Sequence, residues 1–302
     1  DSLTLLALQK QTATASGPYL AMAMRGTVED MKGQLVPEIF EKYEKFEEFI
    51  NQGKLVSDGR NEDTLNANYY YEMLISDARA EKIHNRIRRT LLSALQNKTQ
   101  LYINGYVKGK DLSDTIDLFQ AYLEQRKAFE MVDSSFILFN NISARYLFLE
   151  SLFMRDNTKS LELLEKCIEI EPDAAYAFNQ MGAIYVECRE FEKAEKALKK
   201  AIELAPNWSY PFNNLGIVYY KTERFETSIE YYQRAIENDP SSVNPYSNLG
   251  NLYIVTGDTA TAIQYYKHAI TVDGSYTDAY LNLAAVNIHR RMFEDAEKIF
   301  LQ

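Results

Sequence analysis

Residues 209–242 read SYPFNNLGIVYYKTERFETSIEYYQRAIENDPSS, and this pattern recurs on both sides of them at intervals of 34 residues. Four columns of residue types keep this interval together. They are Gly182, Gly216 and Gly250, continued by Ala284; Tyr185, Tyr219 and Tyr253; Ala201, Ala235 and Ala269; and Pro172, Pro206 and Pro240. A period of this length indicates stacked supersecondary units, none of which can bury its apolar face alone. The sequence therefore predicts a solenoid.

Each unit has the pattern of two helices. The first helix carries the glycine, and the second carries an apolar stripe that ends before the proline, as at Pro206. Glycine and alanine allow two helices to approach closely, while tyrosine, phenylalanine and leucine fill the space between repeats. Proline stops the second helix because it lacks a backbone N–H. We therefore expect an all-α protein.

The repeat resembles a known family. Its pattern of Leu215-Gly216, Tyr219, Phe225, Ser228, Tyr232, Ala235 and Pro240 is similar to that of the tetratricopeptide repeat, a helix-turn-helix unit. This resemblance implies a right-handed α-solenoid over residues 141–302. It would consist of a divergent repeat at 141–174, repeats at 175–208, 209–242 and 243–276, and a partial repeat at 277–302. Because the last repeat stops inside its second helix, we expect the protein to continue beyond Gln302.

Residues 1–140 have helical periodicity without the repeat. The apolar residues from Val28 to Ile50 recur at steps of three and four and predict a helix from Thr27 to about Gly53. A longer helix is predicted from about Thr64 to Tyr102, and a third after Asp111. These helices predict an N-terminal antiparallel bundle. The alternative is a set of degenerate helical hairpins that continue the repeats.

A basic stripe lies on the second predicted helix, at Arg79, Lys82, Arg86 and Arg89. It could be a docking site for an acidic partner or for phosphates. However, a chain that folds back near Asp58 brings Arg79 opposite Glu38, and Arg86 opposite Glu29 and Asp30. We therefore predict ion pairs inside the hairpin, and a surface or boundary position for His84.

Charge and cysteine content limit the function. The net charge is −10, and it divides into −3 for residues 1–140 and −7 for residues 141–302. An acidic solenoid is a poor binder of nucleic acid or anionic membrane, and no apolar run is long enough to span a bilayer. Cys167 and Cys188 fall at positions typical of small buried residues. We expect a cytoplasmic protein, although an earlier segment could precede Asp1.

A column of side-chain amides precedes each glycine or its equivalent by two residues, at Gln180, Asn214, Asn248 and Asn282. In the family that the repeat resembles, the first helices line a concave groove that binds peptides. An amide offers both a donor and an acceptor, so it can pair with the main chain of an extended peptide. The alternative is that these amides bond the neighbouring repeat or water.

Polar and aromatic residues beside this column extend the predicted peptide-binding site. They are Asn179, Asn213, Tyr210, Tyr220, Lys221 and Asn251, with Tyr176 and Asn244 as further candidates. Aromatic side chains next to amides suit an extended segment with apolar anchors. Tyr210 and Tyr220 could equally be packing residues.

No motif of an enzyme is present: the sequence has no phosphate loop, paired cysteine motif or metal-ligand spacing. We therefore predict no catalytic residues, no metal and no cofactor. The leading hypothesis is a non-catalytic scaffold that binds an extended segment of a partner protein. Two alternatives remain: the recognition arm of a larger protease or transferase whose catalytic domain lies outside this chain, and a ligand sensor in the N-terminal bundle. The sequence does not indicate the oligomeric state.

Overall fold

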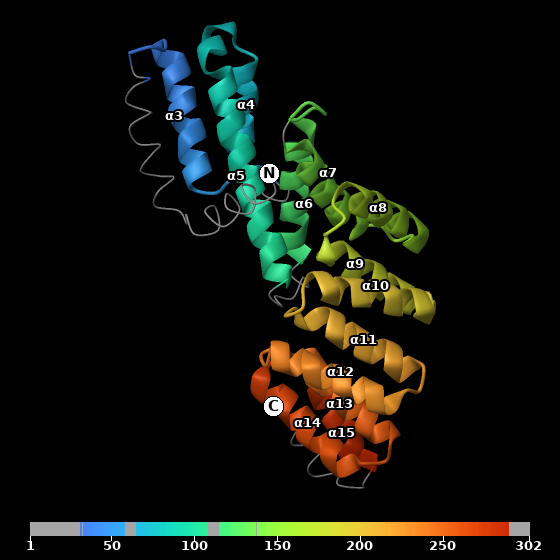
Figure 1. Cartoon of the computed structure of the whole chain (residues 1–302). Helices are drawn as coiled ribbons and strands as arrows, with labels where there is room; N and C mark the ends of the chain where they lie inside the picture. Colours follow the sequence, from blue (N-terminus) through green and yellow to red (C-terminus); the bar gives the residue numbers. More distant parts are fainter. Residues whose placement is uncertain (1–30, 32, 58–64, 108–114, 137, 290–302) are drawn as a thin grey trace. The chain divides into compact units, whose positions relative to one another are not determined.

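The computed structural model describes residues 31, 33–57, 65–107, 115–136 and 138–289, and all regular elements in these ranges are helices (Figure 1). The all-α class is thereby confirmed. The chain divides into two compact units, residues 1–100 with 119–135 and residues 101–118 with 136–302. The predicted domain boundary at residue 140 stays a prediction.

The first unit contains helices from the region before the repeats. They are α3 (Pro37–Asn51), α4 (Ala67–Ile75) and the 3-10 helix η1 (Ala78–Ile83), together with parts of α5 (His84–Val107) and α6 (Thr115–Glu130), which also contribute residues to the second unit. The predicted apolar face of α3 is buried at Ile39, Tyr43, Phe46 and Ile50. Lys98 of α5 forms an ion pair of 2.7 Å with the buried Glu124 of α6.

The prediction of one continuous helix from Thr27 to Gly53 is wrong within the described residues. The chain turns at residues 33–35, and α3 begins at Pro37. Proline favours the first position of a helix and keeps the residue before it extended, as it does at Val36 with ψ 148°. The predicted stop near Gly53 is confirmed, since Gly53 has a φ of +69°. Residues 27–30 and the Asp58 turn lie outside the described residues.

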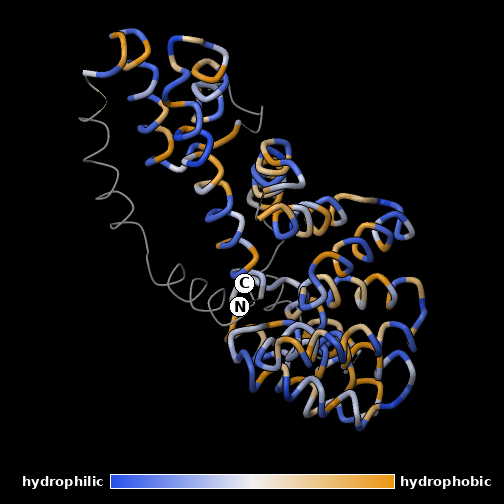
Figure 2. The backbone as a smooth tube through the Cα atoms, turned by 45° about the horizontal axis from the view of Figure 1, so that its top comes forward, coloured by the Kyte–Doolittle hydropathy of each residue, from blue (hydrophilic) through white to orange (hydrophobic). Residues whose placement is uncertain are grey.

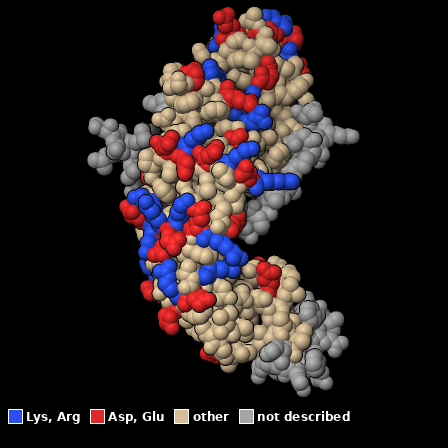
Figure 3. All heavy atoms as spheres, turned by 90° about the vertical axis from the view of Figure 1, so that its right-hand side faces the viewer, with Lys and Arg blue, Asp and Glu red and all other residues tan. Residues whose placement is uncertain are grey.

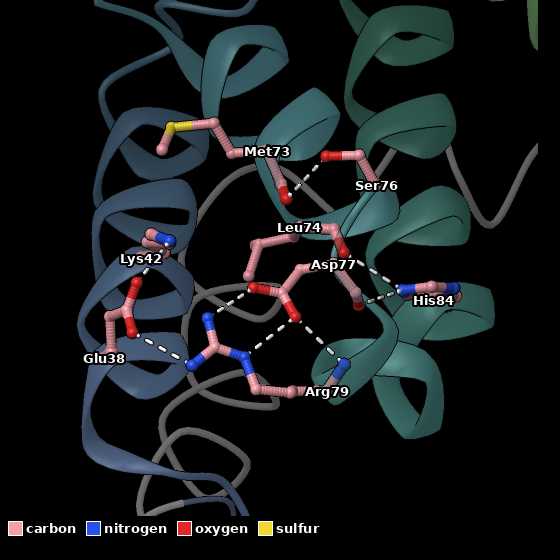
Figure 4. A network of polar contacts seen from close by, with 8 residues as sticks. All are labelled: Glu38, Lys42, Met73, Leu74, Ser76, Asp77, Arg79 and His84. Atoms are coloured by element: carbon pink, nitrogen blue, oxygen red, sulfur yellow. Dashed lines mark hydrogen bonds and ion pairs between the residues drawn. The ribbon is translucent and has the colours of Figure 1, made fainter.

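The prediction of one helix from Thr64 to Tyr102 is also wrong. Polar side chains near Asp77 interrupt it by hydrogen bonding to the backbone (Figure 4). Asp77 accepts a hydrogen bond of 2.9 Å from the backbone N–H of Arg79, and Ser76 donates one to the carbonyl of Met73. Short polar side chains compete in this way with helical bonding. His84 lies 3.0 Å from the carbonyl oxygen of Leu74, which explains its half-buried position.

The predicted ion pair between Arg79 and Glu38 is confirmed. The guanidinium of Arg79 lies between Glu38 of α3 and Asp77 (Figure 4), at 3.0 Å from the first carboxylate and 2.8 Å from the second. Hydrogen bonds from Arg79 lower the pKa of Asp77 to about 2. Arg86 lies over the ring of Tyr43, at 5.8 Å from its centroid. Its predicted partners Glu29 and Asp30 lie outside the described residues.

The second unit contains the repeats. Besides the last turns of α5 and the first residues of α6, its helices are α7 (Phe139–Ser151), α8 (Asn157–Ile170), α9 (Ala175–Glu187), α10 (Phe191–Leu204), α11 (Ser209–Lys221), α12 (Phe225–Asn238), α13 (Val243–Val255), α14 (Thr259–Val272) and α15 (Thr277–His289). The most extensive helix–helix contacts join α7 with α8, α9 with α10, α11 with α12, and α13 with α14. Hydrophobic and hydrophilic segments alternate along these helices (Figure 2), as helices buried on one face require. The predicted solenoid of helix pairs is confirmed.

The turn inside each pair repeats its backbone conformation. Arg189, Glu223 and Gly257 stand at equivalent positions and have φ values of 60°, 59° and 88°. This left-handed residue ends the first helix. The preceding residue in the first of these turns is Cys188, which is exposed, so the prediction that both cysteines are buried holds for Cys167 alone.

The glycine column marks the closest approach of the two helices in a pair. A Cβ atom added to Gly216 would lie 2.4 Å from the ring of Tyr232, and one at Gly250 would lie 2.4 Å from the ring of Tyr266. At Gly182 the neighbour is Leu198. These partners are all fully or nearly fully buried. The glycines are therefore required for packing.

We predict that Gly216→Ala destabilises the solenoid by about 1–3 kcal/mol, because the added methyl group overpacks the contact with Tyr232. The urea concentration at the midpoint of unfolding, followed by circular dichroism, measures this effect. Gly274→Ala is the matched control, since the nearest atom to its Cβ is at 4.0 Å. Equal midpoints for the two variants would contradict this account of the column.

Hydrogen bonds to the carboxylate of Glu195 link the repeat of α10 to that of α11. Glu195 accepts hydrogen bonds from Tyr219 at 3.0 Å, from Lys199 at 2.7 Å and from Arg224 at 2.8 Å. Partial burial raises the pKa of Glu195, but these hydrogen bonds outweigh it and lower the pKa to about 2. The ionised carboxylate is therefore stabilised in the folded state.

We predict that the free energy of unfolding falls as the pH is lowered from about 4.5 to about 2, and falls less in Glu195→Gln. The lowered pKa of Glu195 makes its contribution fully present above its ordinary pKa and lost as the pH approaches 2. Solvent screening limits the difference to about 1 kcal/mol or less. Urea titrations at several pH values measure it, with Glu203→Gln as a control on the same helix. A pH dependence unchanged in Glu195→Gln would refute the assignment.

Candidate functional site

The first helices of the repeats, α9, α11, α13 and α15, contact one another in this order. We call the surface that they present to solvent the first-helix surface. The predicted site residues all lie on these helices: Gln180, Asn179, Asn213, Asn214, Tyr210, Tyr220, Lys221, Asn248, Asn251 and Asn282. They do not all face solvent, because Asn179 is 2% exposed and Asn251 bonds with Tyr266 of the second helix α14.

Amides on neighbouring first helices form hydrogen bonds with one another. Asn214 of α11 donates to the side-chain oxygen of Asn179 of α9 at 3.0 Å, and Asn248 of α13 donates to that of Asn213 of α11 at 2.9 Å. The same relation holds in both pairs, 35 residues apart in sequence. Each donating amide keeps a second N–H and its oxygen for other partners. The column thus joins adjacent repeats, as the alternative interpretation expected.

Other candidates also have partners inside the solenoid. Asn251 accepts a hydrogen bond of 2.7 Å from Tyr266, and Asn244 accepts one of 3.1 Å from Tyr276. Lys221 lies 5.9 Å from the centroid of Tyr220, which is half-buried. Gln180 and Asn282 are half-buried. These contacts orient the amide oxygens and leave the polar surface partly accessible.

Tyr176 belongs to the packing of the unit. It is buried, and its hydroxyl donates to Glu171 at 2.9 Å, while its ring lies 4.6 Å from that of Phe148. Burial raises the pKa of Tyr176, so the hydroxyl stays protonated. Phe148, which replaces the expected glycine, is fully buried. The divergent repeat thus fills its space with aromatic rings.

Tyr106, near the end of α5, lies over the α9 and α11 end of the first-helix surface. Its hydroxyl accepts a hydrogen bond of 2.9 Å from Asn179. Its ring lies 5.2 Å from Trp208, 5.8 Å from Tyr210 and 6.0 Å from Phe148. Burial raises the pKa of Tyr106, so it too stays protonated. This contact could not be predicted from the sequence, because Tyr106 lies outside the repeat period.

Apolar side chains are exposed at the other end of the first-helix surface. Ile254 and Val255 of α13 are 37% and 53% exposed, and Leu281 and Ile288 of α15 are 49% and 45% exposed. Ile254 and Ile288 stand at equivalent repeat positions, and Leu281 lies two turns before Ile288 on the same face. The sequence analysis missed this group.

The charge of the repeats falls along the chain. Among α13, α14 and α15 the charged residues are Lys267 and Asp278, and α13 has none, whereas α10 carries Glu192, Glu195, Glu203 and four lysines. On the face drawn in Figure 3, lysine and arginine atoms lie among aspartate and glutamate atoms in no separate areas. The first helices α13 and α15 therefore carry few charges, with Asp278 as their one acidic or basic side chain besides histidine.

Two features are absent from the part of the chain that the structure describes. No group of three His, Cys, Asp or Glu side chains there could hold a metal ion. None of the described helices has the length and apolar character needed to cross a bilayer.

Comparison with known proteins gives a family match. Residues 173–241 and 211–275 match the model of the family described as tetratricopeptide repeat, and no curated protein matches the chain. A solved structure of Pseudomonas aeruginosa PilF is similar, with 20% identity and a TM-score of 0.52, over 70% of this chain and 90% of that one. A MamA structure from Desulfovibrio magneticus RS-1 has 18% identity and a TM-score of 0.43, over 59% and 97% of the two chains. The likeness to PilF concerns the fold.

We predict that Asn214→Ala destabilises the solenoid more than Asn248→Ala. Removal of Asn214 leaves the oxygen of Asn179, which is 2% exposed, without that donor, at a cost of about 1–3 kcal/mol. Removal of Asn248 exposes the half-buried Asn213, which water can reach. Urea midpoints of the two variants measure the difference. Equal midpoints would show that the burial of Asn179 does not matter for this bond.

Proposed function

Because residues 173–275 are tetratricopeptide repeats, we propose that this chain is a non-catalytic scaffold that binds an extended segment of a partner protein on its first-helix surface. The observation that carries the proposal is the exposure of Ile254 and Val255 on α13, next to Leu281 and Ile288 on α15, the last described helix. Exposed apolar side chains that gather on one surface are typical of interaction sites. The repeat fold supplies a preformed surface for such a site.

The amides next to this group favour an extended ligand. Asn248 and Asn282 lie on the same two helices as the apolar side chains. Asn248 uses one of its two N–H groups in its bond with Asn213. A main chain that lies along the surface can bond with the remaining donors and acceptors, while alternate side chains contact the apolar group. This arrangement supports binding of a segment without secondary structure of its own.

The low charge of α13 to α15 favours a neutral ligand. A charged segment would lose hydration on this surface and find few charged partners, since Asp278 is the one charged aspartate, glutamate, lysine or arginine of α13 and α15. The partner segment would thus carry apolar anchors and few charges. Such contacts are individually modest, and we expect dissociation constants of about 1–100 µM.

A selection of random peptides displayed on phage, made against the whole chain, tests the proposal. We expect neutral peptides with spaced apolar residues. Leu281→Ser should lower the affinity for a selected synthetic peptide by about 10-fold, as measured by calorimetry, because truncation of an interface anchor costs more than about 1 kcal/mol of binding free energy. Asn248→Ala should make the binding free energy of the same peptide less favourable by about 1–3 kcal/mol.

Gln264→Ser with Lys267→Ser is the matched control, since both residues are exposed on the second helix α14. This control should leave the affinity unchanged. Selected peptides that bind equally well to Leu281→Ser, Asn248→Ala and the original chain would place the binding surface elsewhere and refute the proposal.

A further inference from the structure

The contact of Tyr106 with the repeats has the composition of a binding site for a phenol. A tyrosine side chain needs apolar contact for its ring and a hydrogen-bond partner for its hydroxyl. Trp208, Tyr210 and Phe148 contact the ring, and the amide of Asn179 donates to the hydroxyl at 2.9 Å. Three separate parts of the second unit thus converge on one side chain.

We propose that this is a tyrosine-binding site of the first-helix surface, that Tyr106 fills it as an internal ligand, and that a tyrosine of the partner segment displaces Tyr106. The inference rests on the proposed function and names one anchor of the peptide. Tyr106 then acts as an autoinhibitory contact, since the site is available to a partner only when it leaves.

The position of Asn179 supports the proposal. Its oxygen accepts from Asn214, and its nitrogen donates to Tyr106. The bond between the repeats therefore orients the amide nitrogen towards the site. Asn179 is one of the residues predicted from the sequence to contact a peptide. In the structure its amide already donates a hydrogen bond to a tyrosine hydroxyl. The internal contact thus shows the chemistry that this part of the surface accepts.

Tyr106 lies outside the repeats, so its contact with Asn179 is not part of the packing that recurs from repeat to repeat. Tyr106 comes from α5, 73 residues before Asn179, whereas the inter-repeat amide bonds join residues that are 35 apart. An internal ligand of this kind lowers the apparent affinity for an external one by the fraction of molecules in which the site is open. Its release would increase binding without any new contact.

The indole nitrogen of Trp208 indicates that Tyr106 satisfies the site incompletely. Trp208 is 2% exposed, and its Nε1 is buried with no hydrogen-bond partner among the described residues. A buried donor without an acceptor is unfavourable. A peptide that brings a main-chain carbonyl together with a tyrosine ring would supply the acceptor, which the contact with Tyr106 does not. This difference favours exchange of the internal ligand for an external one.

Trp208 also reports on the site, because it is the single tryptophan of the chain and its ring lies 5.2 Å from that of Tyr106. We expect Tyr106→Ala to shift the tryptophan emission to longer wavelength, since water then reaches the indole. N-acetyl-L-tyrosinamide should bind to this variant, shift the emission back and saturate. N-acetyl-L-leucinamide, which lacks the phenol, should bind at least about 10-fold more weakly. Leu101→Ala, an exposed position on the same helix, should behave as the original chain.

Tyr106→Phe keeps the ring and removes the hydrogen bond with Asn179, so it serves if Tyr106→Ala does not fold. We expect it to bind N-acetyl-L-tyrosinamide about 2- to 10-fold more tightly than the original chain, the factor that one net hydrogen bond contributes. The affinity of Tyr106→Phe for selected peptides that contain tyrosine should increase by the same factor, whereas its affinity for peptides without tyrosine should not change.

The proposal is overturned if neither folded variant binds N-acetyl-L-tyrosinamide better than the original chain, or if tyrosine-containing peptides gain no affinity in Tyr106→Phe. These outcomes are distinct from failure of the proposed function. The small probe tests the tyrosine site without any peptide, whereas Leu281→Ser tests the peptide surface at α13 and α15 without changing Tyr106.

Discussion

The close approach of two helices at a glycine is the constraint on which the repeats depend. At Gly216 and Gly250 there is no room for a Cβ atom, because the rings of Tyr232 and Tyr266 lie against the backbone. A side chain at the glycine would push the helices apart and remove contacts that bury those rings. The second helix therefore covers one side of the first helix, and the other side is left to form the first-helix surface.

The polar joints between repeats follow from this packing. Once the first helices lie side by side, the amides of Asn214 and Asn248 reach the preceding repeat and bond with Asn179 and Asn213. Each of these amides uses one N–H in the bond between neighbouring helices and retains a second N–H and its oxygen for other partners. The presence of such a column is consistent with ligand binding and with structural support at the same time.

The first-helix surface is not uniform along the repeats. At α9 and α11 it is aromatic and is covered by Tyr106 of the chain itself. At α13 and α15 it carries few charges and has exposed aliphatic side chains such as Ile254 and Leu281. The repeat therefore supplies one backbone framework with two chemistries, one contacted by Tyr106 of the same chain and one with exposed aliphatic side chains.

The sequence by itself determined the all-α class and the helix pairs, because a fixed period of 34 residues places equivalent residues in equivalent environments. It also identified the ion pair of Arg79 with Glu38, since a helical hairpin brings opposite charges together. It misjudged helix continuity at Pro37 and Asp77, where local backbone bonding competes with apolar periodicity. Only the tertiary structure decided that Tyr106 meets Asn179 and Trp208, because a contact between residues so far apart leaves no periodic trace in the chain.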